Sequence, residues 1–529
     1  MQLINTKISY EIGETEVFTT QLINNDYSIN IHIKENLLKA NISTSKQLHN
    51  FKIDFYVKID SSYSEFLTNG YQTWMPSQKI IENGKSCPLK NKMLAKITKG
   101  TGLDYLGEYN KPYDKEASFG LCYFKTKENS KILLFCSLSE LDTFTKYTFD
   151  FERHILKISR EFYGYSINKN MEIANILLIE GNYYEAFAEL KEKLNNNTNL
   201  NTTAIENRKI DDKNTQNDSA DTKENKNIKH NNVSIANAHQ DTPQRIIGYN
   251  TFCEFQNNIS QQIINNKIYS INKIYNAFFI GDGYSEKSCD IFNIDNKRFP
   301  TGLKPIVDSI HEKGIKAGIW IAPFAISPLS QSFSKYADIA LKQNNKQAIT
   351  CPFWNGTYSI DITLPDSQEY LKNMFDIIID CGFDIIYCDC IYLAGSIPTG
   401  GKTQAMLIND AVKLIKKFAC DKTLIFGGVP YLSAYGNCDF INISSEPKNI
   451  WQNPLDFLSP QMPISSKSNV QNLPLKMYMD LLHSCIYTIP DSKKIKTKLV
   501  NYIAHNFSNI MTSDKHIIPT TYPSQIKLD

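Results

Sequence analysis

Alternation of apolar and polar residues is the main feature of the first third of the chain. Residues 29–34 and 51–60 alternate with a period of two, as expected for strands with one buried face. Many short strands with few helical patterns predict a β-sandwich over residues 1–180. One apolar stripe follows at steps of four, three and four, and it consists of Tyr183, Phe187, Leu190 and Leu194. This spacing predicts a connecting helix over residues 181–194.

A polar segment follows the predicted helix. Residues 195–243 are rich in Asn, Lys, Asp, Thr and Ser, and they contain no aromatic side chain. Such a segment cannot bury enough apolar surface to offset the entropy that is lost on ordering it. We therefore expect a disordered linker or surface insertion, and we attribute no function to it.

The rest of the chain alternates between short apolar runs and helical stripes. The predicted strands are 246–250, 277–280, 316–323, 383–389, 424–428, 440–444 and 509–511. Repeated strand–helix units predict a (β/α)8 TIM barrel over residues 244–515, followed by a C-terminal tail over residues 516–529. An open doubly wound sheet is the alternative. It is the weaker one because no Gly-x-Gly-x-x-Gly fingerprint follows the first strand.

Composition and charge narrow the range of functions. The 57 Lys and Arg residues balance 55 Asp and Glu, which argues against a nucleic-acid-binding protein. No apolar run approaches the roughly 18 residues that cross a bilayer, so no membrane partner is expected. The absence of a signal-like start and the 12 scattered cysteines favour a cytoplasmic protein with reduced thiols. No paired Cys or His motif indicates a metal site, and no cofactor is expected.

Carboxylates follow several of the predicted barrel strands. Barrel enzymes carry their working residues at the C-terminal ends of strands, which selects Asp282, Asp389 and Glu446. Two carboxylates that face one sugar ring would make a glycosidase. Structural interpretations are also open: a helix cap or ion-pair partner for Asp389, a turn residue for Asp282, and a solvated loop for Glu446. Three tryptophans could stack on sugar faces or anchor the core, namely Trp74, Trp320 and Trp354.

Several motifs resemble those of one enzyme family in order and spacing. They are Asn69–Trp74, Gly248–Phe252, Ile280–Tyr284, Arg298–Lys304, Gly318–Phe324 and Ser359–Pro365. Together they resemble the α-galactosidases of glycoside hydrolase family 36, the melibiase group. The resemblance implies a β-sandwich followed by a TIM barrel. It also implies a retaining glycoside hydrolase that cleaves a terminal α-linked sugar, most simply an α-galactosidase that acts on an oligosaccharide or glycoside.

The resemblance also assigns roles to single residues. Asp389 matches the catalytic nucleophile, and Glu446 falls where the family has its acid/base Asp. Asp282 matches the second Asp of a pair that binds sugar hydroxyls, and Trp74 is expected to shape the pocket from the β-sandwich. Four further residues occupy candidate substrate-binding positions, namely Trp320, Tyr387, Asn442 and Asp290.

Departures from the family pattern fall mostly on the sugar contacts. Gly281 replaces the first Asp of the pair, Tyr387 replaces a Lys, and Asn442 replaces an Arg. Gly427 stands where the family has Cys, and Cys289 begins a segment that lacks the expected Trp. We therefore expect altered sugar recognition. Two functions stay open, a glycosidase and a catalytically impaired member that acts as a carbohydrate-binding or interaction protein. The resemblance also leaves a homo-oligomer open.

Overall fold

The computed structural model describes most of the predicted sandwich and most of the predicted barrel. The described residues are 2–69, 78–81, 117–126, 131–182, 185–196, 245–351, 354, 356–443, 485–488 and 509–512. The predicted linker over residues 195–243 lies almost wholly outside this part, and the predicted tail over residues 516–529 lies entirely outside it.

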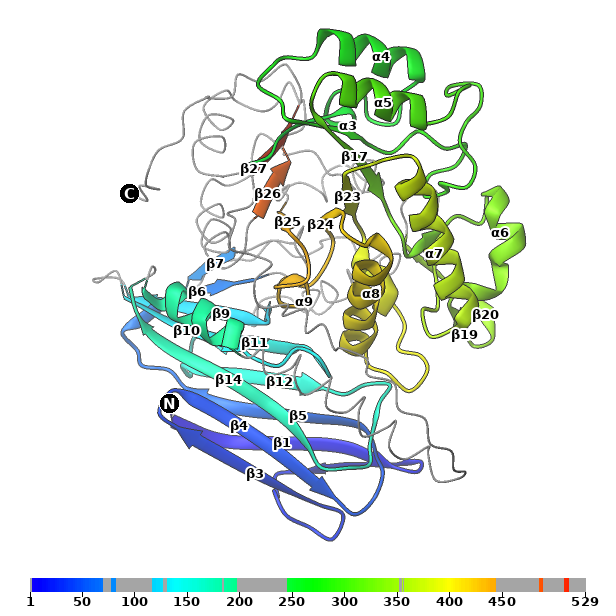
Figure 1. Cartoon of the computed structure of the whole chain (residues 1–529). Helices are drawn as coiled ribbons and strands as arrows, with labels where there is room; N and C mark the ends of the chain where they lie inside the picture. Colours follow the sequence, from blue (N-terminus) through cyan, green and yellow to red (C-terminus); the bar gives the residue numbers. More distant parts are fainter. Residues whose placement is uncertain are drawn as a thin grey trace, which may run out of the picture.

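Two seven-stranded sheets form the N-terminal part of the chain (Figure 1). One sheet has the order β2–β1–β5–β12–β11–β8, with β13 paired to β5. Its strands are β1 (Gln2–Ile12), β2 (Thr15–Thr19), β5 (Leu48–Lys58), β8 (Ala117–Phe119), β11 (Thr145–Asp150), β12 (Ile155–Glu161) and β13 (Ser166–Ile167). The other sheet has the order β3–β4–β14–β10–β9–β6–β7. Its strands are β3 (Tyr27–Lys34), β4 (Leu37–Thr44), β6 (Tyr63–Thr68), β7 (Gln78–Ile81), β9 (Leu121–Thr126), β10 (Ile132–Ser137) and β14 (Met171–Gly181).

The two sheets share one apolar core. In β5 the alternating residues Phe51, Ile53 and Phe55 are fully buried, as the period-two pattern predicts. Across the sandwich, the ring of Phe124 on β9 lies edge-on to that of Phe149 on β11, with centroids 4.7 Å apart. The two sheets therefore pack face to face, and the sandwich expected from the alternation is present.

A closed barrel of eight parallel strands forms the second part. Its strands are β15 (Ile247–Asn250), β16 (Ala277–Ile280), β17 (Lys316–Ile321), β23 (Ile385–Cys388), β24 (Thr423–Phe426), β25 (Phe440–Ile443), β26 (Cys485–Thr488) and β27 (Asn509–Thr512). The ring excludes the open doubly wound sheet. Sequence analysis missed β26, because the four residues of this strand show too little pattern to distinguish a strand from a helix turn.

Large and small residues alternate inside the barrel. Phe279 on β16 points between two neighbouring strands, where Gly248 and Gly318 leave space for its ring. A Cβ atom at either glycine would lie 2.4 Å from the Phe279 ring. The barrel interior is therefore packed with side chains below the strand ends, as is usual for this type of barrel.

Helices connect successive barrel strands from β15 to β25. They include α3 (Thr251–Phe255), α4 (Gln261–Ser270), α5 (Lys304–Glu312), α6 (Gln331–Tyr336), α7 (Pro365–Asp380), the 3-10 helix η5 (Ile391–Gly395), α8 (Gln404–Ala419) and α9 (Tyr431–Ala434). The apolar stripes of α4, α5 and α7 are buried as the sequence predicts. Asp366 is not the N-cap of α7. Because Pro365 opens α7 and Leu364 is its N-cap, Asp366 lies inside the first turn.

Helix α8 joins the barrel to the sandwich. The side-chain amide of Asn409 donates to the main-chain oxygen of Glu140 at 3.0 Å. The hydroxyl of Thr403 donates to the main-chain oxygen of Asp142. Figure 1 shows α8 and α9 between the barrel strands and the sandwich. Residues 185–196 are helical, and Phe187 and Leu190 are buried in the same apolar cluster as the barrel. One core therefore runs from the sandwich into the barrel.

Two further observations concern the described residues as a whole. No helix among them is both long enough and apolar enough to span a membrane. Ten cysteines in this part of the chain are free thiols, and seven of them are buried.

Candidate active site

Asp389 lies directly after β23 at the rim of the barrel. Its side chain is fully buried. The indole N–H of Trp320 donates to its Oδ2 atom at 3.1 Å, and the hydroxyl of Tyr387 donates to the same atom at 2.9 Å. The main-chain N–H of Cys390 donates to Oδ1 at 2.9 Å. The carboxylate is therefore held in one orientation by three neutral donors.

Strand pairing explains why two of these donors converge. Trp320 on β17 and Tyr387 on β23 are register partners, so their side chains leave the same face of the barrel wall. Asp389 lies two residues beyond Tyr387 and therefore points to that face as well. Tyr387 is buried, and burial together with the Asp389 carboxylate raises the pKa of its phenol well above the ordinary value. The phenol stays protonated and acts as a donor.

Asp282 lies two residues beyond the end of β16. Its Oδ1 accepts the N–H of Gly283 at 2.8 Å, and its Oδ2 accepts the hydroxyl of Ser288 at 2.9 Å. The indole N–H of Trp354 also donates to Oδ2, at 3.2 Å. Burial raises the pKa of Asp282, and these hydrogen bonds oppose the rise only in part.

Two tryptophans connect the carboxylates. The ring centroids of Trp320 and Trp354 lie 5.9 Å apart with the planes inclined by 55°. Trp320 binds Asp389 and Trp354 binds Asp282, so the contact forms a continuous path between the two acidic groups. The Trp320 ring is almost completely buried, whereas Trp354 is only half-buried. Trp354 is thus the more exposed aromatic face of the pair.

The hydrogen bonds of Asp290 do not belong to the path between the two carboxylates. Its Oδ1 accepts the hydroxyl of Ser332 on α6 at 2.6 Å, and its Oδ2 accepts the amide of Asn293 at 2.8 Å. The side chain is buried. Its contacts join the loop after β16 to α6, and its predicted role in substrate binding stays a prediction.

The remaining predicted residues divide into two groups. Asn442 is buried on β25, where it is the register partner of Ile486 on β26. Glu446 and Trp74 lie outside the described residues. The structure therefore gathers Asp282, Asp389 and their aromatic donors, while the proposed acid/base pairing stays a prediction.

The glycine that replaces the first family Asp occupies a crowded position. A Cβ atom on Gly281 would lie 2.6 Å from the Cβ atom of Phe252 on α3. The N–H of Gly281 also donates to the hydroxyl of Thr251 at 2.9 Å. Helix α3 therefore fills the space that a side chain at position 281 would need, and an Asp cannot be accommodated without moving this helix.

Buried thiols surround the two carboxylates. The pKa values of Cys289 and Cys390 are raised well above the ordinary value, first by burial and then by nearby acidic groups that include Asp282 and Asp389. Raised pKa values keep thiols protonated and weakly nucleophilic. No group of described Cys, His, Asp and Glu residues has the arrangement of a metal site.

Some residues that orient the two carboxylates could not be identified from the sequence pattern. Ser288 donates to Asp282 from a loop without periodic pattern, and the Cys390 N–H depends on a left-handed backbone with φ of 55°. Trp354 was recognisable as an aromatic candidate. Its hydrogen bond to Asp282 was not, because the two residues are 72 positions apart in sequence and only the fold brings them together. The carboxylates themselves could be found from the sequence, both by the strand-end rule and by the family resemblance.

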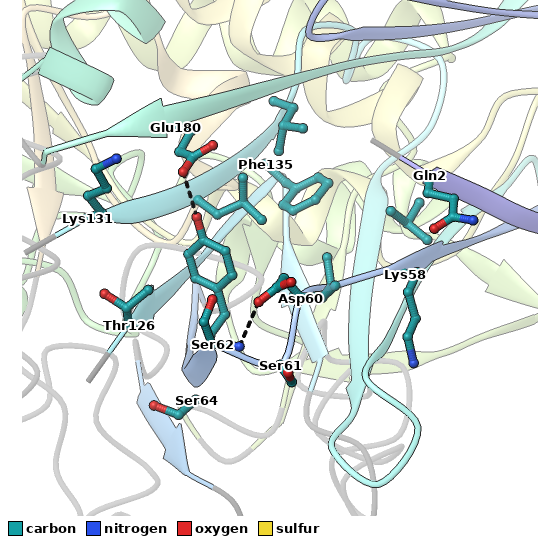
Figure 2. A pocket seen from close by; sticks show the side chains of 15 residues that line it. Gln2, Lys58, Asp60, Ser61, Ser62, Ser64, Thr126, Lys131, Phe135 and Glu180 are labelled. Carbon is teal, nitrogen blue, oxygen red and sulfur yellow. Dashed lines mark hydrogen bonds between the residues drawn. The ribbon is translucent and has the colours of Figure 1, made fainter. Parts of the chain in front are cut away.

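A pocket of about 730 Å³ opens elsewhere, at one end of the sandwich (Figure 2). Its floor includes Ile59 and Phe135, and its rim includes Asp60, Lys131 and Glu180. Every residue that lines it belongs to the sandwich. None of the residues predicted for the barrel site contributes to it.

Comparisons with known proteins relate the barrel part of the chain to α-galactosidases. The model of the Melibiase family matches residues 276–392, a segment that contains Asp282 and Asp389. An α-galactosidase of Escherichia coli is 26% identical over 81 residues, which cover 15% of this chain and 11% of that protein. The aligned segment thus spans only about a tenth of this relative.

Solved structures show the likeness of the fold over nearly the whole chain. The α-galactosidase TtGalA of Thermus thermophilus, solved in complex with stachyose, has a TM-score of 0.63 and 15% identity, with 98% of this chain and 97% of that chain covered. The family 36 α-galactosidase AgaA of Geobacillus stearothermophilus has a TM-score of 0.55 and 9% identity, with 98% and 68% covered. These findings confirm the resemblance inferred from the motifs: residues 276–392 match the Melibiase family model, and the fold is similar to that of solved α-galactosidases over nearly the whole chain.

Proposed function

We propose that the protein is a glycoside hydrolase of the α-galactosidase type that cleaves a terminal α-linked sugar by double displacement. Asp389 is the proposed nucleophile and Glu446 the proposed acid/base. In this mechanism the Asp389 carboxylate attacks the anomeric carbon while the acid protonates the leaving oxygen. Water then releases the sugar, and the same acid group serves as the base. Asp282 binds the hydroxyls of the sugar.

One observation carries the proposal. Asp389 and Asp282 follow two strands of one closed barrel, within the melibiase segment, and each carboxylate is oriented by an indole donor. Fixed orientation of a carboxylate is what nucleophilic attack requires, because misplacement by about 1 Å can cost roughly 100-fold in rate. Neutral donors also stabilise the carboxylate without neutralising its charge.

A second candidate function rests on the burial of Asp389. The side chain is fully buried and both oxygens accept hydrogen bonds, which is also what a structural carboxylate shows. This observation favours a catalytically impaired member that binds carbohydrate without cleaving it. The two candidates differ in one measurable outcome, which is turnover.

Aryl α-glycosides provide the test. A structure of TtGalA was solved with p-nitrophenyl α-D-galactopyranoside, so this compound and its gluco and manno analogues make a suitable panel. We expect turnover of at least one of them by the wild-type protein and its loss in Asp389→Asn. Asp308→Asn is the matched control, because Asp308 is an exposed carboxylate on α5. Sugar binding by calorimetry with no turnover in any variant would establish the binding protein instead.

The stereochemistry of the product tests the mechanism separately. Double displacement releases the sugar with its α configuration retained, and early NMR spectra of the product distinguish retention from inversion. Release of the β anomer would exclude Asp389 as a covalent nucleophile. Glu446 is proposed as acid in the first step and base in the second. Azide should therefore restore turnover of p-nitrophenyl α-D-galactopyranoside by Glu446→Gln, because this leaving group needs little protonation and azide replaces the water that Glu446 would activate.

The proposal includes the architecture and setting expected from the sequence. We propose a complete (β/α)8 barrel, because eight parallel strands close the ring and helices cover its first half. A cytoplasmic location and an oligosaccharide substrate belong to the same proposal. Stachyose and raffinose are bound in the solved relatives, which makes these two sugars the first natural substrates to assay.

A further inference from the structure

Tyr387 and Gly427 differ from the family pattern at two neighbouring strand ends, and the structure relates the two positions. A Cβ atom on Gly427 would lie 2.8 Å from Cε2 and 2.9 Å from the hydroxyl oxygen of Tyr387. It would also lie 2.6 Å from Oδ1 of Asp389. Real Cβ atoms essentially never come so close to other heavy atoms. Any side chain at position 427 would therefore displace the phenol, the carboxylate or both.

The strands explain this crowding. Tyr387 is the register partner of Ile425, and Cys388 is the partner of Phe426, so Asp389 faces Gly427 one step further along. The main chain fixes this approach, because the N–H of Gly427 donates to the oxygen of Cys388 at 2.9 Å. The gap between β23 and β24 thus cannot widen locally without loss of a barrel hydrogen bond.

We infer that Tyr387 and Gly427 work as one unit that positions the carboxylate of Asp389. Gly427 leaves the space through which the phenol reaches Oδ2, and the phenol and Trp320 together hold that oxygen. The main-chain N–H of Cys390 holds Oδ1, so donors on both oxygens fix the plane of the carboxylate. This catalytic role rests on the proposed function, whereas the coupling of the two residues does not.

Unfolding measurements test the coupling without any need for activity. Gly427→Ala should lower the thermal midpoint of unfolding in the wild-type background. The decrease should be smaller in the Tyr387→Ala background, because this substitution removes two of the three close contacts of the added Cβ atom. Gly318→Ala is the matched control, because the three atoms nearest to its added Cβ all belong to Phe279. Its effect should be the same with and without Tyr387→Ala. Equal effects of Gly427→Ala in both backgrounds would overturn the inference.

Failure to fold is also informative in this design. If Gly427→Ala yields no folded protein alone but folds together with Tyr387→Ala, the rescue supports the coupling. If neither variant folds while Tyr387→Ala alone does, the clash with Asp389 dominates and the unit of Tyr387 with Gly427 is refuted.

Kinetics test the positioning role. Tyr387→Phe keeps the ring but removes one donor from Oδ2, so we expect kcat to fall roughly tenfold or more with KM little changed. The acidic limb of the pH profile should move to higher pH, because a carboxylate that loses a donor is protonated more easily. A rise in KM with kcat and the acidic limb unchanged would show that Tyr387 contacts substrate and does not position Asp389. Turnover that is absent from the wild type would refute the proposed function, and the unfolding experiment would still decide the coupling.

Discussion

The barrel rim and the sandwich pocket contain similar groups in different environments. At the rim, Asp282 and Asp389 are buried and accept hydrogen bonds on both oxygens. In the pocket, Asp60 and Glu180 are exposed, although Glu180 accepts the hydroxyl of Tyr63 at 3.2 Å (Figure 2). Both places combine carboxylates, an aromatic ring and hydroxyls. Residue content alone therefore does not distinguish a reaction site from a surface hollow.

The difference lies in how firmly each carboxylate is held. Burial raises the pKa of Asp282, while hydrogen bonds from Ser62 lower that of the exposed Asp60. A buried carboxylate with fixed donors is oriented before substrate arrives, and its interactions are little screened by water. Water competes for the donors of an exposed carboxylate and screens its charge. These properties support the proposed reaction site at the barrel rim and not in the sandwich pocket.

Loss of a carboxylate should have very different effects in the two places. Asp389→Asn removes the proposed nucleophile, and we expect kcat to fall roughly 10³-fold or more. Glu180→Gln changes a pocket carboxylate of the sandwich and should leave kcat and KM unchanged. Assays with p-nitrophenyl α-D-galactopyranoside measure both variants. A comparable loss of activity in both variants would remove the distinction between rim and pocket.

Restoring the family residue at position 281 should destabilise the protein. Gly281→Asp places a Cβ atom 2.6 Å from Phe252, and overpacking of this kind typically costs about 1–3 kcal/mol. Denaturant unfolding of this variant measures the cost, with Gly13→Ala as a second glycine variant. Gly13 lies in a sandwich turn with open space around it, so its cost comes from its φ of +61° alone. Wild-type stability in Gly281→Asp would show that α3 yields easily to a side chain.

Part of the fold and part of the candidate site could be predicted from the sequence. Alternation in β5 predicted the sandwich, and strand–helix periodicity predicted most of the barrel strands, because both patterns repeat over many residues. The strand-end rule found Asp282 and Asp389 without any contact information. Strand β26 and the donors Ser288 and Cys390 were not predictable. They depend on main-chain geometry and on partners that only the folded barrel brings together.

The two indole donors should affect different kinetic constants. Trp320→Phe removes a donor from Asp389, and we expect kcat to fall roughly 10- to 100-fold because the proposed nucleophile is less well oriented. Trp354→Phe removes a donor from Asp282, which is proposed to bind sugar hydroxyls, so KM should rise more than kcat falls. Steady-state kinetics on one aryl glycoside separate the two effects. Identical changes in both variants would mean that the tryptophans act only as a packed pair.

The smallest expected effect is a difference in the pH dependence of stability. Asp282 has a raised pKa in the folded protein, so the native state binds its proton more tightly than the unfolded chain does. Wild-type stability relative to Asp282→Asn should therefore fall as pH rises from the ordinary Asp value of 3.8 through the folded pKa.

Asp60 has a lowered pKa, so the stability that it contributes is present above 3.8 and is lost as pH falls through its folded pKa. Wild-type stability relative to Asp60→Asn should accordingly rise with pH over a window below 3.8. Denaturant unfolding of the three proteins between about pH 3 and pH 7 measures these slopes, and slopes of the same sign would show that burial at the rim does not govern Asp282.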